Sequence, residues 1–425
     1  MKKVKFQSPT GTHDILPEDQ KYFKRIAEVV EEVAAYYDYS RIDTPLIEQT
    51  ELFSRGLGMS TDIVQKEMYS FKTKGEDLLT LRPEGTTPVV RSYLEHGMFN
   101  LPQPIKLFYL GPFFRYEKPQ AGRYRQFWQF GFEILGEESA VMDAQMIQIF
   151  YNILKEIGLK NLVVEINSIG DNQCRPYYKK LLANYLRSRE SSLCSDCRRR
   201  LKENPLRILD CKEEGCQPIK AQAPQTVDHL CELCHAHFKE VLEFLEEIEL
   251  PYRMNSRLVR GLDYYTRTVF EIFDESDPTL ALAGGGRYDP LVKLLGGSET
   301  PGMGAAAGIE RIVQVMKTKD LKLGKPLETK IFLAQLGGLA KRRSLRLVEE
   351  FRKARVPVAE LLGRDSLKTQ LNRADKLQVD FTLILGQKEA LEKTIILRDM
   401  KSGRQDTIKM DKIVEAVKDR LKSKK

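Results

Sequence analysis

Phe127-Trp128-Gln129-Phe130-Gly131-Phe132-Glu133-Ile134-Leu135 is the stretch that decides the fold. Its side chains alternate with a period of two, which is typical of a β-strand, because successive side chains of a strand point to opposite faces. One face is apolar throughout and predicts packing on a core: Trp128, Phe130, Phe132 and Ile134. The other face presents an amide at Gln129, a gap at Gly131 and a carboxylate at Glu133. We expect the gap to leave room for a small ligand.

A partner strand is expected directly before this stretch. Ile105–Glu117 also alternates, and the connection Lys118–Gln126 contains Pro119 and Gly122, so the two strands should form a hairpin. Arg115 and Glu117 share one face of the first strand, and the loop carries Arg123-Tyr124-Arg125. The alternative interpretation is an edge hairpin whose polar face is merely solvated.

Helical patterns and glycine-rich stretches flank the hairpin. A helix is expected after Leu16-Pro17, because apolar residues recur at helical spacing up to Tyr37, and a second over Asp143–Ile157. Downstream, Tyr264–Phe273 reads as a strand. Gly284-Gly285-Gly286 would allow close backbone approach, and Gly302–Gly308 would lead into a helix.

The last hundred residues alternate between strands and helices. Strands are expected at Lys330–Leu336, Val356–Leu362, Phe381–Leu385, Thr394–Asp399 and Asp406–Met410, with helices at Leu339–Ala354, Ser366–Leu377 and Asp411–Leu421. This order is typical of a compact α/β domain. Residues 317–328, rich in lysine, read as the linker that precedes it.

Length and charge bound the possible functions. The chain has 425 residues, so two to four domains are expected at about 100–200 residues each. Apolar residues make up 42%, too many for a disordered chain, and no apolar run approaches the roughly 20 residues that span a bilayer. The N-terminus has no apolar stretch after its lysines, so a signal peptide is not expected and the cytoplasm is the expected compartment.

The net charge of +8 is unevenly distributed. Residues 328–425 hold 24 basic and 14 acidic residues, a net of +10, which leaves −2 for residues 1–327. A basic appendage of this kind either contacts phosphates or forms a solvated basic surface, and composition alone does not separate the two.

The residues suited to chemistry are arginines and carboxylates. They occur in four stretches: Leu81–Pro88, Arg257–Tyr265, Ala283–Asp289 and Ala306–Arg311. The sequence contains no P-loop motif and shows no nucleophile–base pair. Arginines and carboxylates alone suggest catalysis by positioning and charge neutralisation, which is the logic of nucleotidyl transfer.

These stretches resemble histidyl-tRNA synthetases, a family of class II aminoacyl-tRNA synthetases. Phe114–Glu117 with Arg123 and Phe127–Glu133 resembles motif 2, Pro45 after a long helix resembles motif 1, and Gly308–Arg311 resembles motif 3. Two further stretches resemble the signatures peculiar to histidyl enzymes, namely Arg260–Tyr265 and Gly284–Asp289. The opening Pro9–Asp14 also fits.

The resemblance implies an α+β fold and three domains. An antiparallel sheet flanked by helices would form the catalytic domain from residues 1–170 and 248–325. A helical insertion with a cysteine cluster would occupy residues 171–247, and an α/β anticodon-binding domain residues 328–425. Motif 1 implies a homodimer.

The resemblance also implies the reaction and its partners. Histidine and ATP, with Mg²⁺, would give histidyl-adenylate and pyrophosphate, and the histidyl group would then move to the 3′ end of its tRNA. Arg115, Arg260 and Arg311 would be catalytic, and together with Glu117 they would bind ATP. The loop residues Arg123 and Arg125 would contact the tRNA acceptor end.

The histidine pocket implied by the family has two ends. Glu84 and Thr86, with Gln129, would hold the amino and carboxylate groups, while Glu133 and Tyr264 would hydrogen-bond the two imidazole nitrogens. Partners on both edges of the ring would reject side chains that lack those nitrogens. Gly85 and Tyr265 complete the implied set.

Six of the seven cysteines lie between Cys194 and Cys234. Two Cys-x-x-Cys pairs can close a tetrahedral zinc site, so Cys194, Cys197, Cys231 and Cys234 are the candidate ligands of a structural zinc. Cys211, Cys216, His235 and His237 are further candidates, and the alternative is a set of reduced thiols without metal.

Two other functions compete with the enzyme. The first is a non-catalytic, synthetase-like regulatory paralogue, which would lack the C-terminal domain and lose signature residues. The second is a basic RNA-binding module with a silent active site. The C-terminal domain and the signature residues are both present here, which favours the enzyme.

Overall fold

The predicted hairpin lies inside a sheet and not at its edge. The computed structural model describes residues 6–423 except 121, 322, 324–329, 355 and 362–365. In it, β5 (Ile105–Phe114) and β6 (Gln126–Leu135) pair antiparallel over their full lengths. β6 also pairs with β11 (Gly302–Gly308) and β5 with β1 (Ser40–Arg41). The edge-hairpin interpretation is therefore wrong.

Eight strands form the main sheet, in the order β1-β5-β6-β11-β10-β9-β7-β8. All neighbours pair antiparallel except β1 with β5 and β7 with β8. The remaining strands of this sheet are β7 (Leu162–Ser168), β8 (Tyr252–Met254), β9 (Thr266–Asp274) and β10 (Asp277–Arg287). A small antiparallel sheet joins β2 (Ile47–Gln49), β4 (Leu78–Leu81) and β3 (Tyr69–Lys72).

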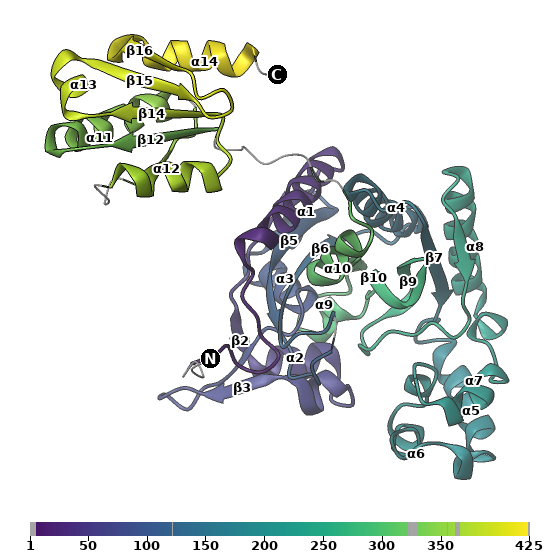
Figure 1. Cartoon of the computed structure of the whole chain (residues 1–425). Helices are drawn as coiled ribbons and strands as arrows, with labels where there is room; N and C mark the ends of the chain where they lie inside the picture. The colour runs from purple at the N-terminus through teal and green to yellow at the C-terminus, as the bar shows by residue number, and fades with distance from the viewer. Residues whose placement is uncertain are drawn as a thin grey trace. The chain divides into compact units, whose positions relative to one another are not determined.

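Helices pack against both faces of the main sheet (Figure 1). The predicted apolar face of β6 packs, through Phe130, Phe132 and Ile134, with the helices α1 (Pro17–Tyr36), α4 (Ala140–Ile157), α8 (Glu232–Glu247) and α10 (Ile309–Thr318). The opposite face packs with α2 (Thr50–Leu57), α3 (Thr86–Glu95) and α9 (Leu291–Leu294). The helices predicted after Leu16 and around Asp143 are thus confirmed as α1 and α4.

The two glycine-rich stretches form neighbouring strands. Gly284–Gly286 lies in β10 and Gly302–Gly308 is β11, although glycine weakens a strand. A Cβ atom on Gly285 would lie 2.2 Å from the carbonyl oxygen of Gly304, so the two backbones approach more closely than any side chain allows. The expected close approach is confirmed, but the strand character was not predicted.

The insertion forms a small helical cluster with its own core. Its helices are α5 (Arg175–Arg187), α6 (Ser195–Glu203) and α7 (Gln217–Ala221), which gather around Tyr178, Leu182 and Ile208. α8 leaves this cluster, because Phe238, Val241 and Leu245 pack in the main core, where α8 lies along α4.

Residues Gly324–Lys425 form a second compact unit, separate from Met1–Leu323. Its five-stranded sheet has the order β13-β12-β14-β15-β16. Its strands are β12 (Ile331–Gln335), β13 (Ala359–Glu360), β14 (Phe381–Leu385), β15 (Thr394–Asp399) and β16 (Gln405–Lys409). Its helices are α11 (Gly338–Lys353), α12 (Leu367–Lys376), α13 (Gln387–Glu392) and α14 (Ile413–Ser423).

The α/β prediction for this unit is confirmed, with α13 as the one element that it omitted. Half of the expected linker over residues 317–328 and the last residue of the predicted strand Val356–Leu362 lie outside the described residues. Short turns of helix complete the chain: Ile63–Glu67, Met98–Asn100, Glu190–Ser192, Pro205–Ile208, Glu214–Cys216, Thr226–His229 and Met410–Lys412.

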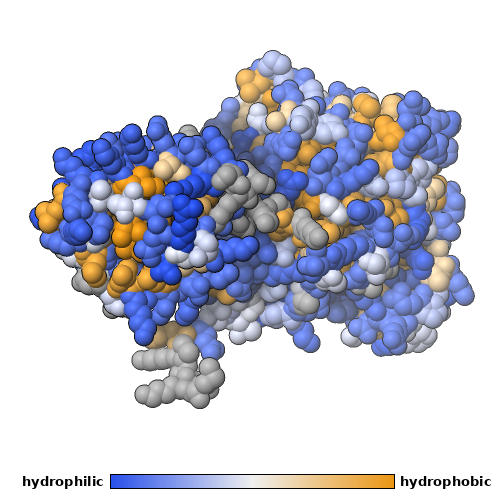
Figure 2. Space-filling model, turned by 45° about the horizontal axis from the view of Figure 1, so that its top comes forward, coloured by the Kyte–Doolittle hydropathy of each residue, from blue (hydrophilic) through white to orange (hydrophobic). Residues whose placement is uncertain are grey.

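Hydrophilic residues dominate the face shown in Figure 2, with hydrophobic residues interspersed among them. This agrees with a chain in which 30% of residues are charged. Within the described part of the chain, none of the helices has the length and apolar character needed to cross a bilayer.

Candidate active site

One cavity of about 750 Å³ brings most of the predicted site residues together. It is lined by residues from the β4–α3 turn, the β5–β6 hairpin, the segment before β9, and β11 with the start of α10. Eleven predicted ligand residues line it: Glu84, Gly85, Thr86, Arg115, Glu117, Arg123, Gln129, Arg260, Tyr264, Tyr265 and Arg311. Glu133 and Arg125 do not.

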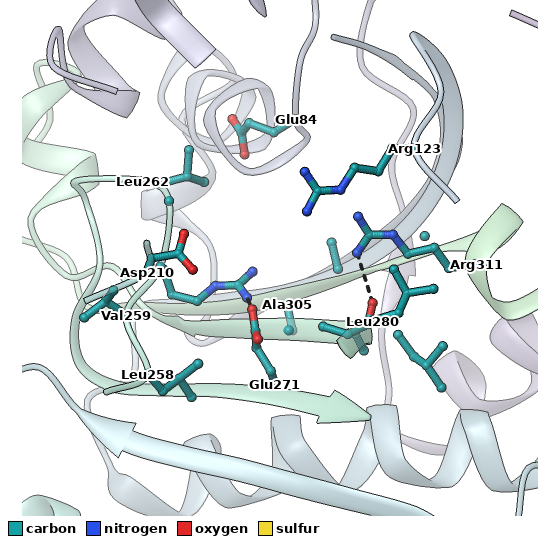
Figure 3. A pocket seen from close by; sticks show the side chains of 18 of the residues that line it. Glu84, Arg123, Asp210, Leu258, Val259, Leu262, Glu271, Leu280, Ala305 and Arg311 are labelled. Carbon is teal, nitrogen blue, oxygen red and sulfur yellow. Dashed lines mark hydrogen bonds and ion pairs between the residues drawn. The ribbon is translucent and has the colours of Figure 1, made fainter. Parts of the chain in front are cut away.

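Three arginines gather at one side of the cavity. Figure 3 shows Arg123 and Arg311 beside one another, facing the cavity. Arg311 is held by Nε donation to the Gly122 carbonyl at 3.1 Å and Nη1 donation to the Ala281 carbonyl at 3.0 Å. Arg115 donates from Nε to the Pro83 carbonyl at 2.9 Å. Backbone carbonyls thus fix the guanidinium groups without neutralising them.

Positive charge exceeds negative charge at this side. Glu117 lies 3.7 Å from Arg115 and 3.5 Å from Arg123, so one carboxylate serves two guanidinium groups. Burial lowers the pKa of Arg311, and the neighbouring cations Arg123 and Arg115 lower it further. A polyanion such as a triphosphate would relieve this repulsion.

Arg260 lies at a different position in the cavity and has its own partner. Its Nη1 donates to Glu271 of β9, and its ring neighbour is Tyr265, with the guanidinium carbon 5.6 Å from the ring centroid. Burial alone would lower the Arg260 pKa, but the Glu271 carboxylate raises it, so the cation is permanent. Arg260 Nε is buried without a hydrogen-bond partner among the described residues.

Glu84 is held by the helix that follows it. Its two carboxylate oxygens accept from the backbone amides of Thr86 and Thr87, both at 2.8 Å, at the N-terminus of α3. These amides have no partner within the helix, and the helix dipole favours a negative charge there. The turn therefore fixes the Glu84 side chain at the cavity wall (Figure 3).

Glu133 lies behind the cavity wall and is fully buried. Its two oxygens accept from the Thr86 hydroxyl at 2.7 Å and the Tyr288 hydroxyl at 2.6 Å. Burial raises the pKa of Glu133 to about 8, because desolvation outweighs the two hydrogen bonds that favour the charged form. Thr86 lines the cavity, so the Thr86 hydroxyl group lies between the cavity and the Glu133 carboxylate.

Tyr109 fills the gap that the sequence assigned to a ligand. A Cβ atom on Gly131 would lie 2.3 Å from the Tyr109 hydroxyl oxygen, and one on Gly85 would lie 2.5 Å from it. The small residue at 131 therefore accommodates an aromatic ring of the neighbouring strand, and the expectation of ligand space over Gly131 is wrong. Tyr109 itself lines the cavity.

Arg125 is occupied by contacts within the hairpin. Its guanidinium lies 3.8 Å from the centre of the Tyr116 ring, and it donates to the carbonyls of Glu117 at 3.2 Å and Thr10 at 3.2 Å. These contacts tie the loop to the N-terminal segment. Of the two predicted acceptor-end contacts, Arg123 is the one at the cavity.

Sequence reasoning missed several residues of the site. Tyr109, Glu271 and Tyr288 were not selected as site residues, although Tyr109 and Glu271 lie on strands whose alternation could have indicated them. The insertion also reaches the cavity through Asp210, Lys212 and Lys220. No sequence signal could have found these three, because their position depends on how the insertion folds back.

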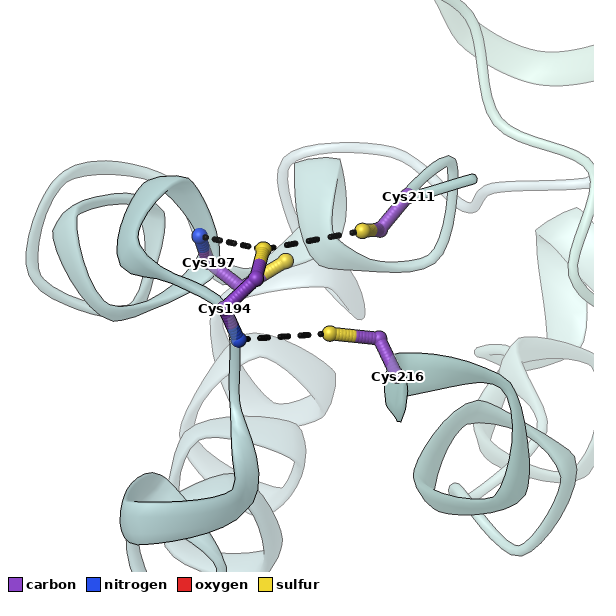
Figure 4. A group of neighbouring side chains, drawn as sticks. All are labelled: Cys194, Cys197, Cys211 and Cys216. Atoms are coloured by element: carbon purple, nitrogen blue, oxygen red, sulfur yellow. Dashed lines mark hydrogen bonds between the residues drawn. The ribbon is translucent and has the colours of Figure 1, made fainter. Parts of the chain in front are cut away.

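The predicted set of zinc ligands is wrong. Cys194, Cys197, Cys211 and Cys216 bring their sulfur atoms within 4.8 Å of one another, and the dashed contacts in Figure 4 join their side chains and backbone amides. Cys231 and Cys234 belong to a different group, with Asp171 and Cys174. Cys194 and Cys197 begin α6 inside the insertion, whereas Cys231 and Cys234 begin α8 at the root of the insertion. His237 is also excluded, because its ring donates to or accepts from Asp143 of α4 at 2.8 Å.

An antiparallel sheet flanked by helices, with arginines from the segments beside its strands gathered at one cavity and an α/β unit after it, is typical of a class II aminoacyl-tRNA synthetase. The chain belongs to the histidyl-tRNA synthetase family. The family described as Histidyl-tRNA synthetase matches residues 11–312, and the family described as Anticodon binding domain matches residues 330–420.

Individual proteins are similar over almost the whole chain. A histidine–tRNA ligase of Dehalococcoides mccartyi is 45% identical over 98% of this chain and 100% of its own. One of Desulfitobacterium hafniense is 45% identical over 98% of both. The apo crystal structure of the Staphylococcus aureus histidyl-tRNA synthetase is 36% identical, with a TM-score of 0.80 over 97% of this chain and 99% of that one.

Proposed function

We propose that the cavity is the site of the histidine–tRNA ligase reaction that this family catalyses. The observation that carries the proposal is the convergence of eleven predicted ligand residues, from segments far apart in the chain, on one cavity. In the first step the histidine carboxylate attacks the α-phosphorus of ATP and pyrophosphate leaves. In the second, a hydroxyl of the terminal tRNA ribose attacks the acyl carbon and AMP leaves.

The arginines would stabilise the charge that develops in the first step. Arg115 would contact the α-phosphate, and Arg260 would sit beside it as a fixed cation, since its pairing with Glu271 keeps it charged. Arg311 would stack on adenine and contact the γ-phosphate. Mg²⁺ would enter with ATP and neutralise phosphate charge, and Glu117 and Glu271 offer the oxygen ligands that it prefers.

Histidine would be recognised at both ends. Glu84, with Thr86 and Gln129, would hold the amino and carboxylate groups, and its side chain is held in place by the α3 amides. Tyr264 and Glu133 would bond the two imidazole nitrogens. A carboxylate has about four acceptor positions, so Glu133 retains capacity beyond Thr86 and Tyr288. An apolar competitor lacks both ring nitrogens and would form neither of these bonds.

The remaining partners follow from the same proposal. Arg123 would meet the tRNA acceptor end, and residues 328–425, with their net charge of +10, would meet the anticodon arm. The catalytic domain would comprise residues 1–170 and 248–325, with 171–247 inserted. The active form would be a cytoplasmic homodimer assembled through the motif-1 region around Pro45.

Zinc at the corrected cluster is a further part of the proposal. The Cys194 and Cys211 sulfurs lie 3.9 Å apart, close to the edge of about 3.8 Å of a tetrahedron built on zinc–sulfur bonds. Backbone amides of Cys194 and Cys197 point at the Cys216 and Cys194 sulfurs, both at 3.4 Å, as amides do toward thiolates. Zinc here would stabilise the insertion and take no part in the chemistry.

The exchange of pyrophosphate into ATP, assayed with each amino acid in turn, tests the function. We expect exchange with histidine alone, followed by charging of tRNA. The same fold occurs in a Bacillus halodurans protein titled as an ATP phosphoribosyltransferase regulatory subunit/histidyl-tRNA synthetase, 22% identical with a TM-score of 0.63, so the fold alone does not separate enzyme from paralogue. Folded protein that shows no exchange would refute the enzyme and favour the regulatory paralogue.

A further inference from the structure

A second group of potential metal ligands lies at the root of the insertion. Asp171, Cys174, Cys231 and Cys234 each offer one ligand atom, and these four atoms lie within 4.8 Å of one another. Asp171 and Cys174 follow the end of β7, whereas Cys231 and Cys234 begin α8. The group therefore joins the segment by which the chain enters the insertion to the segment by which it leaves.

The same three-residue spacing between ligands occurs on both sides of the group. Asp171 precedes Cys174 by three residues just before α5, and Cys231 precedes Cys234 by three residues at the start of α8. At the start of α8 this spacing places two ligand atoms on one side of the first helical turn, as it does for Cys194 and Cys197 at the start of α6. The N-terminal ends of α5 and α8 also favour anionic ligands.

The distances fit a tetrahedral site with one oxygen and three sulfur ligands. Asp171 Oδ1 lies 3.6 Å from the Cys174 sulfur and 3.9 Å from the Cys231 sulfur. A tetrahedron built on zinc bonds to one oxygen and one sulfur has an edge of about 3.5 Å between them. These two pairs would therefore need side-chain shifts of only a few tenths of an ångström to bind a metal ion, and all four ligand atoms lie within 4.8 Å of one another.

Neighbouring groups hold the aspartate and one cysteine in place. The Gln173 amide donates to Asp171 Oδ1 at 2.9 Å, and the Asp171 amide donates to the Cys174 sulfur at 3.3 Å. The Arg267 guanidinium lies 3.7 Å from Asp171 Oδ2 and offsets negative charge. Such outer contacts orient metal ligands and stabilise the anionic forms that bind metal.

We propose that Asp171, Cys174, Cys231 and Cys234 form a second structural zinc site, which clasps the two ends of the insertion. Three thiolates select a soft or borderline metal, and zinc is the one that accepts a tetrahedral set with a carboxylate. The seven cysteines of the chain divide into four in the insertion cluster and three here, so both groups together use all of them.

The clasp is joined to the active-site wall. The Arg267 amide donates to the Gly170 carbonyl at 2.9 Å, and Arg175 donates to the Tyr265 carbonyl at 2.7 Å. A Cβ atom on Gly170 would lie 2.5 Å from the Cys174 sulfur, so this close turn requires glycine. Metal at the clasp would thus fix the segment that carries Tyr264 and Tyr265. The site itself stands whether or not the ligase proposal holds.

The zinc content of the full-length protein, purified under reducing conditions without added zinc, tests the proposal. We expect about two equivalents in the wild type. Cys174→Ser and Asp171→Asn should each hold about one equivalent, and Cys216→Ser should also hold about one, lost from the other cluster. Asp196→Asn is the matched control for the aspartate, because Asp196 is exposed and outside both groups, and it should keep two. A Cys174→Ser variant that holds as much zinc as the wild type would overturn the second site, whether the wild type holds one equivalent or two.

A measurement on the wild type keeps the test independent of variant folding. Alkylation mapped by mass spectrometry should find Cys174, Cys231 and Cys234 protected before chelation and reactive after it. Cys231 is the informative thiol, because it is only half-buried. If its reactivity is unchanged by chelation, it is not a metal ligand and the proposal fails.

Discussion

At the scale of single residues, Arg260 should contribute to catalysis and hardly at all to histidine binding. Its charge would meet a negative charge that grows in the transition state, so Arg260→Ala should lower kcat of histidine-dependent pyrophosphate exchange by about 10²–10³-fold. The KM for histidine should change by less than about threefold. Steady-state exchange kinetics measure both quantities.

The matched control for this prediction is Arg253→Ala. Arg253 is an exposed arginine of β8 that lies 3.6 Å from Glu275, outside the cavity. Its replacement should leave both constants unchanged. Because Arg260→Ala also leaves Glu271 unpaired, the variant's melting temperature must be compared with that of the wild type. Equal losses in kcat and histidine affinity would count against the assigned role.

Glu133 should make stability depend on pH. Its pKa is raised from the model-peptide range to about 8 in the folded protein, so the folded state holds a proton that the unfolded state has released. Its contribution is therefore most favourable below the unfolded pKa and is lost as the pH rises toward 8. Between pH 6 and pH 8.5, the wild type should lose on the order of 2 kcal/mol of unfolding free energy that Glu133→Gln does not lose.

Calorimetric melting at the two pH values measures this difference. Glu76→Gln is the control, because Glu76 is an exposed glutamate that pairs with Lys72 at 3.0 Å. Its melting temperature should follow that of the wild type at both pH values. Parallel pH dependence of Glu133→Gln and wild type would show that the buried carboxyl titrates normally.

At the scale of elements, the strands β10 and β11 can approach each other closely only because their glycines have no side chains. Because the obstacle to a Cβ atom on Gly285 is a carbonyl oxygen and not a flexible side chain, Gly285→Ala should destabilise the first unit by about 1–3 kcal/mol. Gly261→Ala is the control, since no atom lies within 4 Å of its added Cβ, and it should change stability by less than about 0.5 kcal/mol. Thermal unfolding of both variants, measured without substrates, tests this prediction. Equal stabilities of the two variants would contradict the close packing of β10 against β11.

The elements also show which features of the fold the periodicity of the sequence can predict. The alternation of β6 predicted which face packs on the core, because burial selects one face of a strand. It did not predict that Tyr109 of β5 covers Gly131, since two strands pair in a register that the individual patterns leave open. β10 and β11 were missed as strands because their small residues carry no alternating pattern.

At the scale of the whole molecule, the two compact units should divide the reaction between them. A chain ending at Leu323 keeps every residue that lines the cavity. It should retain histidine-dependent pyrophosphate exchange within about threefold and lose most tRNA charging, because the basic excess lies in the second unit. Exchange and charging assays on the two lengths of chain measure this. Loss of exchange in a truncated chain that still folds would place part of the activation site in the second unit.

Salt should affect the two steps differently in the full chain. Phosphate contacts release counterions, so raising salt from 50 to 200 mM should raise the KM for tRNA by more than about tenfold. The KM for histidine, whose contacts are buried, should change by less than about twofold. Equal salt dependence of both constants would contradict an RNA-facing role for the charge of residues 328–425.

By itself, the sequence determined the class of fold, the family and a set of ligand residues, most of which line the cavity. Strand alternation, helix periodicity and motif residues are local signals, and eleven of the ligand residues that they indicated meet in one place. Only the tertiary structure decided which distant groups are partners: Glu271 for Arg260, Tyr288 for Glu133, and Cys174 for Cys231. The physical reason is that spacing along the chain fixes which atoms share a helical turn or a strand face. Which turns and faces then meet depends on the packing of the whole core.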